Sequence, residues 1–168
     1  MSISMYTASV PVLDRMLVNL LAWLDKAEAH ARERGFEPDQ YLSMKLAPDM
    51  LPFAKQIQIA SDAAKGCVCR LAGQDVPKWP DDETTLQALR ERTQRTLDLV
   101  RSMKPAQIDG SETRSIVIPM RTRDPITFDG ENYLRHWALP NFFFHVTTAY
   151  ALLRHAGVAL GKADYLGG

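Results

Sequence analysis

The chain is poor in cysteine and has no excess of charge of either sign. Its only two cysteines are Cys67 and Cys69, and side chains two positions apart on a helix point in different directions. We therefore expect two reduced thiols, and without a Cys-x-x-Cys pattern a metal-binding or redox pair is the less favoured alternative. Lys plus Arg equal Asp plus Glu at 20 each, so no basic surface for nucleic acid is expected.

Long apolar runs and catalytic signatures are also missing. No uninterrupted apolar run approaches the roughly 20 residues of a membrane span, and no short cationic start leads into an apolar segment. We therefore expect no signal peptide, no membrane partner and a cytoplasmic location. No nucleophile-elbow glycine pattern, Gly-rich phosphate loop or His-Glu-x-x-His motif is present, so the sequence does not show whether the protein is an enzyme.

What the sequence does contain is helical periodicity. The chain has 168 residues, of which 46% are hydrophobic, and this suits a single domain over residues 1–168. Apolar residues recur at helical spacing over four stretches, at about 10–34, 49–71, 81–104 and 129–155. Four amphipathic helices bury their apolar faces most economically against one another, which predicts an all-α four-helix bundle.

A short segment before the last helix breaks the helical period. Ile116, Ile118 and Met120 fall at alternate positions, and Ile126 with Phe128 could return as a second strand. The residues between them, Arg121-Thr-Arg-Asp-Pro125, are typical of a turn. We therefore predict a small β-hairpin directly before the last helix.

The helix ends carry recognisable signals. Gly35 is expected to end the first helix, and Asp49 lies where it could cap the second helix or belong to a functional site. The acidic run Asp81-Asp82-Glu83 is expected to open the third helix at the positive end of its dipole. The outer face of that helix is rich in Arg, Gln and Glu and is expected to be solvated.

The last helix places polar residues on its inward face. Asn141 and His145 are one turn apart, and Pro140 predicts a kink or a fresh helix start just before them. Buried polar groups need partners. For His145 the alternatives are a hydrogen bond across the core, a polar pocket or a metal; for Asn141 they are a site or carbonyls freed by Pro140. The inward stripe consists of Leu134, Trp137, Ala138, Asn141, His145, Thr148 and Leu152.

Three further features have two interpretations each. Gln56 either reaches the same cavity as Asp49 or is solvated. Tyr6 either caps this cavity or simply packs against the core. The run Phe142–Phe144 covers too wide an arc for every ring to point inward, so at least one ring lies at a helix contact or a dimer interface, and we expect a homodimer.

The last helix also resembles a known family. The pattern Asn141-x-x-x-His145, followed by Leu152-Leu153-Arg154 and Gly157, is similar to the last helix of the DinB/YfiT-like family, and most similar to an uncharacterised branch with a domain of unknown function. The resemblance implies a four-helix bundle in which a metal is held by one ligand from the second helix and two from the last, spaced His-x-x-x-His. Metal-dependent members include thiol-dependent transferases and isomerases.

The sequence departs from that metal-binding pattern. His145 matches the second histidine of the last helix, Asn141 stands where the first would be, and Asp49 is the nearest occupant of the second-helix position. Zinc prefers histidine and cysteine, so this set would at most hold a weakly bound divalent metal with several waters. Three functions remain open. They are a polar, divalent-metal-binding pocket, a metal-dependent thiol transferase or isomerase, and a non-enzymatic protein that binds a small molecule or forms a dimer.

Overall fold

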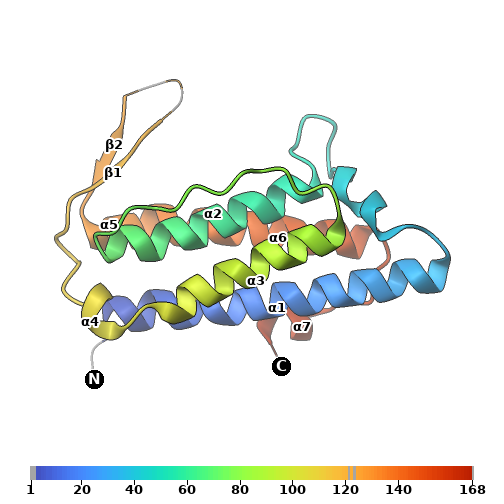
Figure 1. Ribbon diagram of the computed structural model, residues 1–168, viewed down its shortest axis with the longest axis horizontal. Helices are drawn as coiled ribbons and strands as arrows, with labels where there is room; N and C mark the ends of the chain where they lie inside the picture. The colour runs from blue at the N-terminus through green and yellow to red at the C-terminus, as the bar shows by residue number, and fades with distance from the viewer. Residues whose placement is uncertain (1–2, 121, 123, 168) are drawn as a thin grey trace.

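Four long helices lie side by side and form the frame of the molecule (Figure 1). They are α1 (Met5–Arg34), α2 (Phe53–Leu71), α3 (Leu86–Ser102) and α6 (Leu139–His155). Their apolar faces meet in one core, because each amphipathic helix must cover its apolar stripe with its neighbours. The predicted four-helix bundle is confirmed.

Short elements join the long helices. The computed structural model describes residues 3–120, 122 and 124–167. Two of the short helices, α5 and η2, run directly into α6, so that they form one long rod with it. The short elements are η1 (Pro38–Ser43), α4 (Pro105–Ile108), β1 (Ile116–Ile118), β2 (Ile126–Phe128), α5 (Gly130–Tyr133), η2 (Leu134–Ala138) and α7 (Lys162–Leu166).

The predicted β-hairpin is confirmed directly before α5. β1 pairs antiparallel with β2, with Ile116 opposite Phe128 and Ile118 opposite Ile126. Ile116 and Ile118 are buried, and their alternation with exposed Val117 is the period-two pattern of a half-buried strand. Within the predicted turn, Arg121 and Arg123 lie outside the described residues.

Helix α1 is the longest helix of the bundle, with 30 residues. It begins at Met5, five residues earlier than predicted, because Ser4 and Thr7 form a reciprocal capping box. It ends at Gly35, as predicted, where a φ of 74° favours glycine. By length and composition alone α1 could cross a membrane, but its apolar residues lie in the core of the bundle. The cytoplasmic location remains a prediction.

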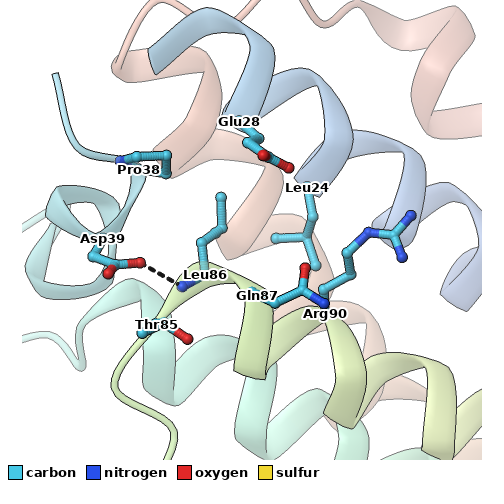
Figure 2. A pocket seen from close by; sticks show the side chains of 8 residues that line it. All are labelled: Leu24, Glu28, Pro38, Asp39, Thr85, Leu86, Gln87 and Arg90. Atoms are coloured by element: carbon cyan, nitrogen blue, oxygen red, sulfur yellow. Dashed lines mark hydrogen bonds between the residues drawn. The ribbon is translucent and has the colours of Figure 1, made fainter. Parts of the chain in front are cut away.

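The starts of α2 and α3 differ from the predicted ones. Pro52 is the N-cap of α2, so the prediction that Asp49 caps this helix is wrong. The chain is non-helical from Met44 through Pro52, and the Phe53 amide donates to the carbonyl of Met44 at 2.9 Å. In α3, Thr85 is the N-cap, and Asp39 of η1 accepts a bond from the Leu86 amide at 2.7 Å (Figure 2). The acidic run therefore does not open α3.

Two of those acids, Asp81 and Glu83, instead hold the segment 72–85, which runs along α2 in Figure 1, against the bundle. Arg92 of α3, whose side chain is only 2% exposed, pairs with Asp81 at 3.0 Å and Glu83 at 2.9 Å. It also pairs with Asp62 of α2 at 3.0 Å. The prediction of a wholly solvated outer face on α3 is wrong at Arg92, because the 72–85 segment covers it.

Candidate functional site

The buried polar centre of the predicted site is a hydrogen bond between α6 and α2. His145 is 8% exposed, and its Nδ1 lies 2.8 Å from Oε1 of Gln56. An amide oxygen only accepts, so Nδ1 carries the proton and Nε2 is the unprotonated nitrogen of the neutral ring. Burial lowers the pKa of His145, which favours this neutral form at physiological pH.

Gln56 is itself held in place from the other side. Its Nε2 donates to the carbonyl of Leu51 at 2.9 Å, just before the first turn of α2. The side chain is 1% exposed, so the alternative of a solvated Gln56 does not hold. The chain Leu51–Gln56–His145 thus satisfies the buried amide on both of its ends and fixes the ring plane of the histidine. This matches the interpretation of His145 as a histidine hydrogen-bonded across the core.

Two of the predicted site residues lie elsewhere. Asp49 is exposed in the turn that precedes α2, and in the described part of the chain the hydrogen bond to His145 comes from Gln56 rather than from Asp49. Tyr6 lies in the first turn of α1, where its backbone amide donates to Asp109 at 2.8 Å and its ring packs against the core. The structure therefore brings His145 to Gln56 and gives Tyr6 a packing role.

Asn141, one turn before His145, faces a small open pocket. Within the described residues no hydrogen bond involves its side chain, including none to the carbonyls near Pro140. The pocket has a volume of about 170 Å³. It lies between α2, β1 and the rod formed by α5, η2 and α6, and is lined by Ile59, Asp62, Ala63, Arg70, Ile118, Tyr133, Trp137, Ala138 and Asn141.

A π-helical turn aligns the rod side of this pocket. The predicted irregularity lies at η2, just before Pro140, where the amide of Leu139 bonds to the carbonyl of Leu134 five residues earlier. In a regular α-helix, residues four apart drift by about 40° around the axis. The wider π turn offsets this drift, so Tyr133, Trp137 and Asn141 all face the pocket.

On the α2 side, the pocket contains a guanidinium group. Arg70 donates to the hydroxyl of Tyr133 at 3.2 Å, with Cζ 6.0 Å from the centre of that ring. Its side chain folds back over Gly66, where a Cβ atom would collide with Nη1 of Arg70. Glycine in a helix interior costs roughly 1 kcal/mol of stability relative to alanine. The close approach of Arg70 explains why glycine nevertheless occupies position 66.

Reactive groups beside the pocket are held in their protonated forms. Burial raises the pKa of the Cys67 thiol to about 12 and also raises the pKa of the Tyr133 phenol. Cys67 and Cys69 are both free and buried, which confirms the predicted reduced thiols. A buried, protonated thiol is a poor nucleophile and a poor metal ligand.

The residues at this site do not fit a resident metal. His145 is the only imidazole, its Nδ1 is occupied by Gln56, and Asp49 is exposed in a loop. Across the described residues there is no group of three or more His, Cys, Asp and Glu side chains that could hold a metal ion. Zinc and similar ions need such a convergent set of nitrogen, sulfur or charged oxygen ligands.

A second hollow, of about 290 Å³, lies where α1, η1 and α3 meet (Figure 2). Its charged groups already have partners: Glu28 accepts from Arg32 at 3.1 Å, and Arg90 donates to Asp25 at 2.8 Å. The carboxylate of Asp39 accepts the Leu86 amide, as the dashed line in Figure 2 shows. We therefore interpret this hollow as the junction at which η1 caps α3. The pocket that Asn141 faces is the better candidate for a ligand site.

Sequence reasoning found Asn141 but missed Arg70 and Tyr133. A signal was present on the rod, since Tyr133, Trp137 and Asn141 recur at every fourth position. No comparable signal marks Arg70, because its importance depends on which residues of α5 lie opposite.

Comparisons with known proteins agree with this fold. Residues 5–166 match the family model described as "Domain of unknown function (DUF1993)". A crystal structure of a DinB family member protein from Shewanella denitrificans is 39% identical, with a TM-score of 0.88, and the match covers 97% of this chain and 92% of that one. The search of curated proteins gave no match. The chain thus belongs to the DUF1993 family and has the DinB-like fold that its last helix indicated.

Proposed function

We propose that this protein binds a small organic molecule in the pocket that Asn141 faces, without a resident metal. The observation that carries the proposal is the half-buried Asn141 amide, which has no hydrogen-bond partner within the described residues and sits beside the Trp137 ring. Ligand sites typically combine apolar or aromatic walls with a few convergent polar groups, and this pocket has both.

In this proposal the His145–Gln56 pair supports the pocket rather than contacting the ligand. Neither residue lines the pocket, but the pair joins α2 to α6 one turn beyond Asn141. This bond fixes the distance between α2 and α6 next to the pocket. The pocket walls are therefore already ordered before a ligand binds, which lowers the entropic cost of binding. The metal-dependent transferase remains the weaker candidate, since the donor set does not fit a metal.

The test is a titration followed by NMR. Small organic compounds added to the ¹⁵N-labelled protein should shift the indole N–H of Trp137 and the side-chain amide of Asn141. Asn141→Leu and Trp137→Ala should weaken binding at least several-fold, whereas His136→Ala, an exposed position on the same rod, should not. A compound panel that moves neither of the two reporter signals would count against a binding function for this pocket.

A further inference from the structure

We infer that the ligand of this pocket is a small zwitterion, an amino acid with an apolar side chain, whose carboxylate meets Arg70 and whose ammonium meets Asp62. The inference rests on the proposed function of the Asn141 pocket and names its class of ligand. Both charged residues come from α2 and both line the pocket.

Arg70 supplies a cation that is positioned but not neutralised. Within the described residues it forms no ion pair, and its partner is the uncharged hydroxyl of Tyr133 at 3.2 Å. Guanidinium is a planar fork that matches a carboxylate in a bidentate manner, and one bond to a phenol leaves most of its donors free. Tyr133 and Gly66 together hold the group against the pocket wall, so a carboxylate would find it already oriented.

Asp62 supplies a carboxylate with one oxygen engaged and one available. Its Oδ1 accepts from Lys65 at 2.9 Å and from Arg92 at 3.0 Å, and both of these cations are buried. No bond of Oδ2 to a described residue is found, and the side chain is 47% exposed. The two buried cations hold the carboxylate of Asp62 in place through Oδ1, so its free oxygen can accept from an ammonium group.

The spacing of the two charges suits an α-amino acid. Arg70 folds back over Gly66, which is one helical turn beyond Asp62. The backbone positions of Asp62 and Gly66 are about 6 Å apart along the helix axis, and Arg70 and Asp62 form no direct ion pair in the described structure. A molecule that carries both opposite charges on one carbon can lie between them and satisfy each.

The rest of the pocket limits the side chain of this ligand. Ile59 and Ile118 line it together with the half-buried Trp137, so an apolar group is favoured beyond the charged end. The volume of about 170 Å³ admits a molecule the size of a small or medium amino acid. Asn141 can donate to and accept from the polar atoms of such a ligand.

The experiment compares three probes that share an isobutyl group: L-leucine, 4-methylpentanoate and 3-methylbutylamine. Each is titrated into the full chain, with the Trp137 and Asn141 signals as reporters. We expect L-leucine to bind roughly tenfold or more tightly than either singly charged probe. Equal affinity for L-leucine and 4-methylpentanoate, with both reporters moving, would overturn the zwitterion while leaving the proposed function intact. Reporters that move with none of the three would overturn both.

Variants assign the two charges. Arg70→Gln should remove the higher affinity of L-leucine relative to 3-methylbutylamine, which lacks the carboxylate. Asp62→Asn should remove its higher affinity relative to 4-methylpentanoate, which lacks the ammonium group. Gly66→Ala keeps the charge of Arg70 but displaces its guanidinium, so it should act like Arg70→Gln. Arg135→Gln, an exposed arginine on the rod paired with Glu131, is the matched control and should change nothing. Unchanged probe selectivity in both Arg70→Gln and Gly66→Ala would overturn the assignment of the carboxylate.

Discussion

Two arginines on neighbouring helices of this bundle have opposite surroundings. Arg92 of α3 is almost fully buried and is paired with three carboxylates and the carbonyl of Pro80. Arg70 of α2 is half-buried, contacts a phenol and forms no ion pair with a described residue. A buried charge that is fully paired has a structural role, whereas a preoriented charge without a counter-ion is available to a ligand.

The largest expected difference between them is in stability. Arg92→Met leaves three carboxylates facing one another beside α2, and should lower the free energy of unfolding by about 3 kcal/mol. The partial exposure of Asp62 and Asp81 keeps this figure at the low end for a buried ion pair. Arg70→Met should change it by less than about 1 kcal/mol. Urea unfolding followed by circular dichroism measures both, and equal losses would erase the contrast.

A second, smaller effect concerns the support beneath the pocket. His145→Ala removes the partner of the buried Gln56 oxygen, which should cost about 1–3 kcal/mol and leave a folded helical protein. Thermal melts with and without a bound compound would separate the two roles of this residue. Complete loss of the helical signal would instead make His145 indispensable to the fold.

The same histidine predicts a pH dependence. Burial lowers its pKa in the folded state, so the unfolded chain binds more protons just below the ordinary histidine pKa. Its contribution to stability is therefore complete above that pKa, near 6.5, and is lost as the pH falls below it. The melting temperature of the wild type should drop between pH 7.5 and pH 5.5 by more than that of His145→Ala. Parallel curves would contradict this assignment.

A smaller change of opposite sign is expected at Gly66. Gly66→Ala should raise the free energy of unfolding by up to about 1 kcal/mol, because alanine favours the helix and the displaced guanidinium of Arg70 is a flexible chain end. Chemical denaturation would measure it. A clear loss of stability would show that the position of Arg70 matters for folding as well as for the pocket.

The smallest expected effect is that of metal removal. Since the residues around His145 do not fit a metal, dialysis against a chelator should leave the melting temperature unchanged. Elemental analysis of protein purified without a metal-affinity tag should find zinc well below one equivalent. Near-stoichiometric zinc after extensive dialysis would restore the metal-dependent transferase as the leading function.

The bundle could be predicted from the sequence because its signals are local. Apolar periodicity marks α1, α2, α3 and α6, and the alternation around Ile116 marks the hairpin. The starts of α2 and α3 could not be predicted, because they depend on long-range bonds. The amide of Leu86 is capped by Asp39, 47 residues earlier in the chain, which no local pattern reveals.

The site divides in the same way. The inward position of Asn141 and His145 followed from helical spacing, and both lie on the α2-facing side of α6. Asp49 directly precedes the apolar stripe of α2 in the sequence, but the chain remains non-helical through Pro52, which leaves Asp49 exposed in a turn. Arg70 could not be distinguished from Arg92 by sequence, since the neighbours that decide their roles lie on other helices and on the segment 72–85.

The π turn at Leu134–Ala138 has a consequence for the length of the chain. It holds one residue more than an α-helical turn would, in the manner of an insertion that the helix absorbs without breaking. Winding the same residues as a regular α-helix would rotate everything beyond the turn by about 100° relative to Tyr133. His145 would then turn away from Gln56 and Asn141 away from the pocket. The π turn therefore sets the rotational register between the two ends of the rod, and a relative with a regular α-helix here should keep that register by being one residue shorter.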